Sequence, residues 1–463
     1  MGRSSTTRSG PLPRPSVRAD DPHLTRFAGV LPFVHFCQAI DLPLLLAAVV
    51  PPAGRKRVHA VHNVIFAFVV ATVVGMERLA HLDWYEGDVL MLKMLRLSSW
   101  PVRQVFSRAL AGVQDAGVAA LLTIITNLGL GSIPGASSAV LDFDSTAIVS
   151  FGEQVGAFFG YCGKGRNRRR HYPLVASIAE SRAAVHVKYR DGSGIDEKEW
   201  LAFFADTVAR VRKRMPDIAL KIRADAGFWS AGTCRWFLEQ DIPFACSIPF
   251  QASVKFALWT ATFAPVDTVD KVPAESDEDD EDDDEGLEIA TVPGPQLGLD
   301  ARVKVVVVRR RVHDSKKPPA GKKIPQDADS RYQAIVTSLD WDPADVWRFY
   351  NGRGDAERVF KTGKQALGLG NLVSQDFRAN EVAFLLRILA FNTDLLFQQA
   401  AEQAAVAEHR PVIRLGLKAR QPRLYGLAGR LLRIHDKWVL RLPRSRKVQA
   451  LWAFYDPSSM RPD

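Results

Sequence analysis

The chain contains 463 residues, of which 47% are hydrophobic and 9% aromatic. This composition can fill the cores of two or three domains, and it excludes a wholly disordered or fibrous protein. The formal charge is +10, although one run at 275–285, "ESDEDDEDDDE", contains ten acidic residues and no basic one. The rest of the chain is therefore strongly basic, which favours a polyanionic partner, either nucleic acid or an anionic membrane face.

The cysteines and the apolar segments narrow the class of protein further. The most apolar stretch, "VIFAFVVATVVGM" at 64–76, has 13 residues, whereas a membrane span needs about 20. It is predicted to be a buried helix, and no membrane partner is expected. The cysteines lie far apart without a CxxC pair, which argues against a disulfide framework or a zinc site and favours a reducing cytoplasm: Cys37, Cys162, Cys234 and Cys246.

The N-terminal part of the chain is predicted to be helical. Residues 1–25 are rich in Arg, Ser, Pro and Gly, which predicts a disordered basic arm. Residues 26–130 carry apolar side chains at helical spacing. Within them Arg103 and Arg108 follow a candidate N-cap, Ser98 or Ser99. This short helix fits the recognition helix of a helix-turn-helix and, equally, an ordinary capped surface helix.

From residue 131 short β-branched runs replace the continuous helical spacing. Strands that come first and then alternate with helices indicate an α/β core with a mixed sheet over 131–250. The predicted strands are "AVLDFDSTAIV", "YPLVASIAE", "AAVHVKYRD", "IALKIRADAGF" and "IPFACSIPF". The predicted helices are "IDEKEWLAFFADTVARVRKRM" and a segment near "SAGTCRWFLEQ".

The remaining sequence is predicted to interrupt this core and then complete it. Residues 251–342 form a β-rich insertion that contains a disordered acidic loop at 275–286. Helical spacing returns over 343–404, and the C-terminal region 405–463 contains a hairpin-like segment, "RLLRIHDKWVLRLP". The predicted fold class is therefore α/β, with an all-helical region before a mixed-sheet core and a β-rich insertion within it.

A polar stripe stands out at 350–364. Tyr350, Arg353, Glu357 and Lys364 occupy relative positions 0, 3, 7 and 14, which a helix gathers within about 60° of arc. A solvated helix face fits the same spacing, and Glu357 with Lys361 fits a plain ion pair one turn apart. The neighbouring glycines, at 352 and 354, weaken a helix at its first turn.

Three carboxylates are candidates for one site. Asp144 lies on the first predicted core strand, Asp225 at the end of a later strand, and Glu357 on the late helix. Converging carboxylates form a hard oxygen site for Mg²⁺ or Mn²⁺, and two such ions about 3.5–4 Å apart support in-line displacement at a phosphodiester. A single Asp at a strand end is more often a turn former or a helix cap, so position alone leaves both roles open.

The motifs resemble those of a known family. The spacing Y-x2-R-x3-E-x6-K is similar to the YREK motif of DDE transposases from bacterial insertion sequences, and "LDFDST" and "RADAGF" resemble the segments with that family's first two catalytic Asp residues. The resemblance implies an RNase H-like core, two divalent metal ions, cleavage at transposon ends and transfer of the freed 3′-OH to target DNA. It also implies a helical DNA-binding domain at 26–130 and a homodimer in the synaptic complex.

Site residues follow from the resemblance position by position. Asp144, which directly precedes "ST", takes the first metal-ligand role, with Asp142 two residues earlier as its main rival; Asp225 and Glu357 take the second and third. Asp355 would point about 160° away from Glu357 on a helix. The predicted DNA-binding residues are Tyr350, Arg353, Lys364, Arg103 and Arg108.

Two other classes of protein remain open on the sequence. One is an RNase H-like DNA nuclease that cuts without joining, since it would use the same metal site. The other is a non-catalytic DNA-binding regulator derived from a transposase, although acids at all three positions count against it. The expected location is the bacterial cytoplasm, on the nucleoid when the protein binds DNA.

Overall fold

The structure is a computed structural model of the whole chain. It describes residues 16, 18–50, 58–163, 166–249, 254–255, 261–266, 287–311, 330–456 and 458, with the side chains of 311 and 355–358 excepted. The predicted acidic loop at 275–286 and most of the predicted basic arm lie outside the described residues.

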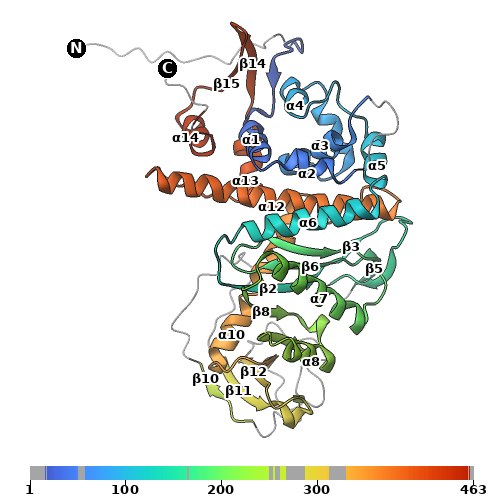
Figure 1. Cartoon of the computed structure of the whole chain (residues 1–463), viewed down its shortest axis with the longest axis vertical. Helices are drawn as coiled ribbons and strands as arrows, with labels where there is room; N and C mark the ends of the chain where they lie inside the picture. The colour runs from blue at the N-terminus through green and yellow to red at the C-terminus, as the bar shows by residue number, and fades with distance from the viewer. Residues whose placement is uncertain are drawn as a thin grey trace, which may run out of the picture.

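A nine-stranded mixed sheet forms the lower half of the molecule in Figure 1. Its order is β10-β11-β12-β13-β9-β8-β2-β6-β7. The strands are β2 (Ser138–Ser145), β6 (Leu174–Ile178), β7 (Ala184–Lys188), β8 (Ala219–Ala224), β9 (Phe244–Ile248), β10 (Ala264–Pro265), β11 (Leu287–Pro293), β12 (Lys304–Arg311) and β13 (Ser330–Thr337). The α/β fold with a mixed sheet that the sequence predicted is confirmed.

The directions of the strands divide this sheet in two. β2, β6 and β7 are antiparallel neighbours, whereas β2, β8 and β9 run parallel. This section, β7-β6-β2-β8-β9, is the mixed part of the sheet that the sequence predicted over 131–250. Crossovers between its parallel strands pass through α7 (Glu197–Arg214) and α8 (Ala231–Glu239), as such connections require.

The β-rich insertion continues the same sheet instead of forming a separate one. β13 pairs antiparallel with β9, and β12 and β11 follow outward. In β12 the residues Val305 and Val307 belong to the core on one face, while Val306 and Val308 belong to the core on the other. A strand covered on both faces is apolar at consecutive positions, which explains why this segment reads as a continuous valine run.

Helices cover both faces of the sheet. α7 and α8 cover one face, where Phe143 of β2 packs edge-on against Phe203 and Phe204 of α7. α10 (Pro343–Asn351) packs on the other face through the cluster that contains Val346 and Tyr350. The strand β2 therefore presents an apolar face to α7, and it also contacts α11.

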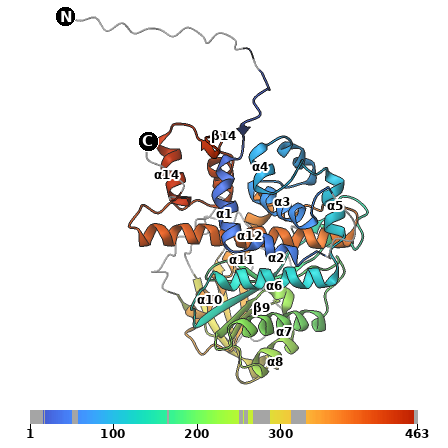
Figure 2. The same ribbon diagram turned by 45° about the horizontal axis from the view of Figure 1, so that its top comes forward.

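A helical layer lies above the sheet in Figures 1 and 2, with α6 and α12 side by side at its base. Its helices are η1 (Ala28–Val30), α1 (Leu31–Ala39), α2 (Leu42–Ala47), α3 (Val61–Val74), η2 (Leu79–Tyr85), α4 (Val89–Met94), α5 (Arg103–Ala111), α6 (Asp115–Gly131), α12 (Phe377–Ala407), α13 (Leu417–Arg420), η5 (Gln421–Tyr425) and α14 (Arg446–Tyr455). α11 (Gly354–Ala366) joins α10 to the segment before α12.

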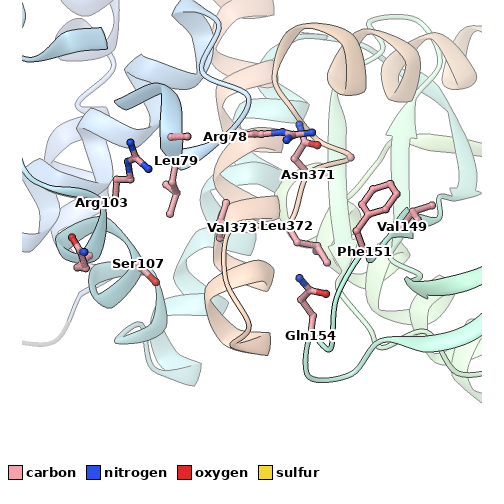
Figure 3. A pocket seen from close by; sticks show the side chains of 13 residues that line it. Arg78, Leu79, Arg103, Ser107, Val149, Phe151, Gln154, Asn371, Leu372 and Val373 are labelled. Atoms are coloured by element: carbon pink, nitrogen blue, oxygen red, sulfur yellow. The ribbon is translucent and has the colours of Figure 1, made fainter. Parts of the chain in front are cut away.

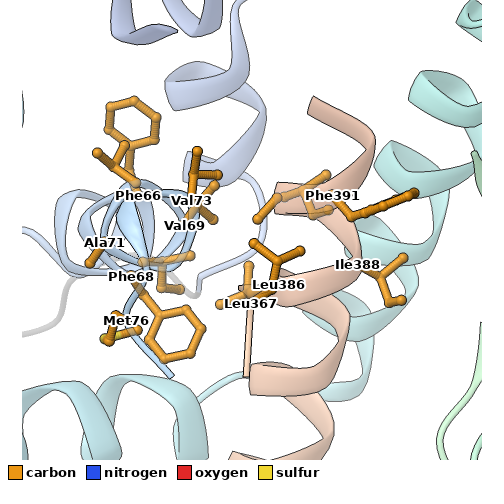
Figure 4. Packing of buried hydrophobic residues seen from close by; sticks show 14 of the residues in the cluster. Phe66, Phe68, Val69, Ala71, Val73, Met76, Leu367, Leu386, Ile388 and Phe391 are labelled. Atoms are coloured by element: carbon orange, nitrogen blue, oxygen red, sulfur yellow. The ribbon is translucent and has the colours of Figure 1, made fainter. Parts of the chain in front are cut away.

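The predicted N-terminal domain does not have a core of its own. Figure 4 shows side chains of α3 and α12, among them Phe68, Val69 and Leu386, packed in one cluster. The central ten residues of α3 are all buried, and a helix that is apolar on every side needs partners around it. Helices from 26–130 and 377–455 therefore share a core, and the assignment of 26–130 as a DNA-binding domain stays a prediction.

The helical layer is fixed to the sheet by close polar packing. The Asn392 side chain of α12 accepts a hydrogen bond from the Ala184 amide at 2.9 Å and donates to the Ala184 carbonyl at 2.7 Å. At Gly129 of α6 an added Cβ would lie 2.4 Å from the same carbonyl oxygen. Both helices thus approach the edge strand β7 closely.

Two smaller sheets complete the fold. β14 (Gly429–Ile434) and β15 (Lys437–Arg441) form the predicted C-terminal hairpin, to which the short β1 (Leu24–Thr25) adds. The other sheet was not predicted: β3 (Ile148–Val149), β5 (Asn167–His171) and β4 (Phe158–Tyr161), in the order β3-β5-β4. Among the described residues no single helix is long and apolar enough to cross a membrane, although α3 with η2 and α5 with α6 pass that test as bent pairs.

Candidate active site

Asp144 and Asp225 stand at the ends of neighbouring parallel strands. In the register of β2 and β8, Asp142 pairs with Arg223 and Phe143 with Ala224. One more step brings Asp144 beside Asp225, which directly follows β8. Because side chains alternate along strands, both carboxylates lie on the face opposite Phe143. The structure therefore brings together the first two acids that the sequence predicted, at the edge where α/β sheets bind ligands.

The rival acid, Asp142, is occupied by an ion pair. Its Oδ1 and Oδ2 accept hydrogen bonds from Arg223 Nε at 2.6 Å and Nη2 at 2.7 Å. Asp142 is only 1% exposed. Burial raises its pKa, and the Arg223 guanidinium opposes that shift. This geometry commits both carboxylate oxygens of Asp142 to Arg223, which gives Asp142 a structural role.

Tyr350 and Arg353 lie on either side of a helix break, which corrects the prediction of one continuous helix. Tyr350 is in the last turn of α10, and Arg353 is the N-cap of α11. The Arg223 side chain packs against this break, since its Nη1 donates to the Phe349 carbonyl at 2.7 Å. A Cβ added at Gly352 would lie 2.5 Å from the same nitrogen, so a larger residue would displace the Arg223 guanidinium from this position.

Arg353 is the central cation of the site. Its Nη1 lies 3.8 Å from Asp144 Oδ1, and the residue is buried. Burial raises the pKa of the Asp225 carboxyl, whereas the positive charge of Arg353 lowers it. A guanidinium that attracts both carboxylates is well placed to hold an anion next to them.

Tyr350 lies in the same cluster. Burial raises the pKa of its phenol to about 12, with Arg353 and a hydrogen bond to the Ser247 side chain opposing the rise. The phenol therefore keeps its proton near neutral pH, as a hydrogen-bond donor requires. Despite the break between α10 and α11, the charges of both Arg353 and Asp225 act on the Tyr350 phenol.

Lys364 reaches the site from the last turn of α11. Desolvation by the surrounding protein lowers its pKa, and the negative charge of Asp144 raises it. Cys162, directly after β4, also acts on this ammonium group. The charge of Lys364 therefore interacts with groups of both the carboxylate site and the sheet β3-β5-β4.

Glu357 lies on α11, one helix with Lys364, but its side chain is outside the described residues. Among the side chains that are described, no group of three or more His, Cys, Asp or Glu is close enough to hold a metal ion. The described donors, Asp144 and Asp225, are both carboxylates, and the charge of Asp225 is disfavoured by burial. Such oxygen ligands fit a hard divalent cation, which would relieve this cost.

Arg103 and Arg108 lie away from the carboxylates, on α5. The helix begins after Val102, which makes no side-chain cap, so the predicted caps at Ser98 and Ser99 are wrong. Arg103 pairs with Asp83 through two hydrogen bonds, one of 3.2 Å, and Arg108 is exposed in the last turn.

A cavity of about 470 Å³ separates α5 from the loop after β3 (Figure 3). Arg103 and Ser107 line it from α5, Phe151 and Gln154 from the opposite side, and Asn371 from the segment before α12. The cavity places polar groups of the helical layer opposite the sheet β3-β5-β4. Arg103 therefore lines a separate surface that adjoins the sheet β3-β5-β4, whereas Arg108 is an exposed residue elsewhere on α5.

Sequence reasoning missed several residues of the site. Arg223 forms the ion pair with Asp142 and donates a hydrogen bond to the Phe349 carbonyl at the helix break. The Ser247 side chain forms a hydrogen bond with Tyr350. Arg223 precedes Asp225 by two residues in "RADAGF", so its position on the same strand face was available from strand alternation. No sequence signal identified Ser247, because its contact depends on the packing of α10 against β9.

The fold and the two strand-end carboxylates define a mixed α/β protein with an acidic, arginine-flanked site. Residues 14–265 and 320–455 match the family described as transposase DDE domain group 1, and the chain belongs to this family. The match includes Asp144, Asp225 and the 350–364 motif. The resemblance to DDE transposases is thereby confirmed at the level of the family.

Solved transposase structures are also similar to the chain. One is the piggyBac transposase synaptic complex with hairpin DNA, with a TM-score of 0.47 and 12% identity over 87% of this chain and 81% of that chain. Another is the Drosophila P element transposase strand transfer complex, with a TM-score of 0.22 and 15% identity over 41% of this chain and 38% of that chain. No curated protein matches the chain in sequence.

Proposed function

We propose that the protein is a DNA transposase that binds the ends of its own mobile element, cleaves there and joins the freed 3′-OH ends to target DNA. The observation that supports this proposal best is the placement of Asp144 and Asp225 at adjacent strand ends with Arg353 3.8 Å from Asp144. The family match supplies the class of reaction. We further propose that the family branch is that of bacterial insertion sequences with the YREK motif.

The reaction has two steps that balance without a redox partner. In the first, a water oxygen bonds to phosphorus and the bond from phosphorus to the 3′ oxygen breaks, which leaves a 3′-OH and a 5′-phosphate. In the second, that 3′ oxygen bonds to a phosphorus of the target, and the target strand's own 3′ oxygen leaves. Each step transfers a proton from the nucleophile and returns one to the leaving oxygen.

The side chains of the site have separate roles in these steps. Arg353 grips a phosphate with its planar fork, and Lys364 adds a point charge beside Asp144. Tyr350, protonated at neutral pH, donates a hydrogen bond. Together they hold the scissile phosphate over the two carboxylates, which would otherwise repel it.

Asp144 and Asp225 would hold divalent metal, with Glu357 as the third ligand. Mg²⁺ or Mn²⁺ fits this donor set, and two ions are expected. When bound, the ions supply Lewis-acid stabilisation of the charge that develops on the phosphate oxygens. Aspartates at strand ends are rigidly placed, which suits ligands that must keep a fixed separation.

The partners follow from this chemistry. Double-stranded DNA, both the element's ends and the target, is the proposed substrate, and the net charge of +10 favours it. End recognition is assigned to the helical layer, including Arg103 and Arg108 of α5. Two copies are expected in the synaptic complex, and the proposed location is the bacterial cytoplasm with binding to the nucleoid.

The deciding experiment is incubation of the purified protein with DNA that carries the element's ends, a target plasmid and Mg²⁺. A transposase gives nicks or breaks at the ends and joined products. Cleavage without joined products would favour the nuclease, and end binding without cleavage would favour a regulator. Inverted repeats on both sides of the coding region would supply the natural ends for this test.

A further inference from the structure

The outer face of the β4–β5 hairpin carries aromatic and basic side chains together. Antiparallel pairing sets Phe159 opposite Arg169 and Tyr161 opposite Asn167, so these side chains share one face. Phe159 is 73% exposed and Tyr161 is 59% exposed, and Arg169 and Asn167 are exposed as well. The Arg169 guanidinium lies 5.8 Å from the centre of the Phe159 ring. Exposed aromatic rings grouped in this way mark an interaction site.

The inner face of the same hairpin is built around one buried arginine, while Phe158 and Arg168 on that face are exposed. Arg170, on the strand position next to Arg169, is buried, and its guanidinium lies 3.7 Å from the centre of the Tyr172 ring. A Cβ added at Gly160 would lie 2.5 Å from Arg170 Nε, so the arginine passes directly over this glycine. Arg170 therefore packs on the inner face of the hairpin, over Gly160. Phe159, at the next strand position, lies on the opposite, outer face.

The hairpin adjoins the carboxylate site. Ser145, the residue after Asp144, donates a hydrogen bond from its Oγ to the Tyr172 hydroxyl at 2.8 Å. At the other end of the hairpin, Cys162 is close enough to Lys364 to act on its pKa. DNA held with its scissile phosphate at Asp144 would thus pass beside the hairpin.

We propose that Phe159 and Tyr161 form a stacking platform for unpaired bases of the DNA strand next to the cut, with Arg169 on its phosphates. This inference rests on the proposed function and adds a substrate feature to it. Aromatic rings beside cations are the means by which proteins hold single-stranded nucleic acid, because every base has a face that stacks. A fully paired duplex offers no free base face, so the charge and the rings together favour an unpaired segment.

The test compares three DNAs with the same end duplex: blunt, with a four-nucleotide overhang, and with an overhang of abasic sites that keeps the phosphates. Affinities are measured for the full-length protein with Ca²⁺, so that cleavage does not interfere. The wild type should bind the normal overhang about 5-fold or more tightly than the abasic one, because stacking contributes about 1–3 kcal/mol per base. Phe159→Ala and Tyr161→Ala should each reduce this preference and leave affinity for the blunt duplex unchanged.

Two matched variants serve as controls. One separates the contribution of base stacking from that of phosphate contacts, and the other tests whether loss of any exposed aromatic ring changes DNA binding. Arg169→Ala should weaken binding to the normal and abasic overhangs alike, since phosphates are present in both. Trp438→Ala, on β15 and 53% exposed, removes a comparable exposed ring far from β5 in Figure 1 and should change nothing.

Several outcomes would overturn the inference. Equal affinity of the wild type for normal and abasic overhangs would exclude the platform while leaving the proposed function intact. So would a change in oligomeric state of Phe159→Ala with an unchanged DNA preference, which would assign the face to a second copy of the chain. Failure to bind any of the three DNAs would overturn the proposed function as well.

Discussion

Asp142 and Arg223 form a two-pronged ion pair between adjacent parallel strands, with N–O distances of 2.6 and 2.7 Å. The pair lies two residues before Asp144 and Asp225 along their strands, and therefore on the same sheet face. Both partners are buried. Loss of one partner from a buried pair leaves the other charge uncompensated, which typically costs about 3–5 kcal/mol.

Substitution of Asp142 should therefore reduce stability, whereas substitution of Asp144 should reduce cleavage without reducing stability. Asp144→Asn should retain the unfolding temperature and reduce cleavage by about 100-fold or more, since a metal ligand is lost. Asp142→Asn should lower the free energy of unfolding by about 3 kcal/mol. The measurements are thermal unfolding and end cleavage on the same preparations. Full cleavage by Asp144→Asn, together with an inactive but stable Asp142→Asn, would reverse the two roles.

The buried Asp225 carboxylate should destabilise the folded protein when it is charged and no metal ion is bound. Its folded-state pKa is raised by burial, so the group favours folding most at low pH and loses that contribution as the pH rises through its folded pKa. Without metal at pH 7, Asp225→Asn should therefore unfold at a higher temperature than the wild type, by on the order of 2 °C. Near pH 4 the difference should shrink.

Metal provides the control for Asp225. Mg²⁺ that binds only the folded state should raise the unfolding temperature of the wild type. It should raise that of Asp225→Asn much less, and the variant should be inactive. An equal Mg²⁺ effect in both proteins would show that Asp225 is not a ligand.

Much of the fold could be predicted because its signals are local. The apolar alternation of β2 and β8 and the helical spacing of α7 lie within single elements, and the order of strands before helices indicated a mixed sheet. Asp144 and Asp225 were identifiable since each ends a strand. The preference for Asp144 over Asp142 came from the family resemblance, whereas its physical reason, the Arg223 ion pair, joins residues 81 positions apart.

The features that were missed depend on contacts between distant segments. The helix break at Gly352 is packed against Arg223, 129 residues earlier. The small sheet contains "NRRRH" in β5, a segment without the apolar alternation that identifies a strand. Residues 26–130 share their core with α12, which begins nearly 250 residues after the end of α6, so no local pattern indicates this contact.

Because of that shared core, end recognition is best tested in the full-length protein. Arg108→Ala should weaken binding to all duplexes alike if the side chain contacts phosphate. Gln104→Ala, on the cavity side of α5, should weaken binding to the element's own end more than to a scrambled duplex, by about 1–3 kcal/mol if it contacts a base. Binding isotherms at two salt concentrations distinguish these results. Unchanged binding in both variants would move end recognition to another part of the protein.

Arg353 and Lys364 should act as a phosphate clamp that does not read sequence. Replacement of either by Ala should reduce binding and cleavage of every end sequence alike, because phosphates carry no base identity. Arg353→Lys should not restore full activity, since an ammonium group lacks the planar fork that spans the space beside Asp144.

Lys361 is the matched control on the same helix. It is exposed one turn before Lys364, and an exposed pair with Glu357 would contribute only about 0.2–0.5 kcal/mol. Lys361→Ala should therefore have a mild effect. The measurements are cleavage rate and the salt dependence of binding for the Ala variants of Arg353, Lys361 and Lys364. A severe defect in Lys361→Ala beside near-normal Arg353 and Lys364 variants would show that the phosphate is held elsewhere. The structure favours Arg353 and Lys364, because the charge of Arg353 acts on Asp225 and that of Asp144 acts on Lys364.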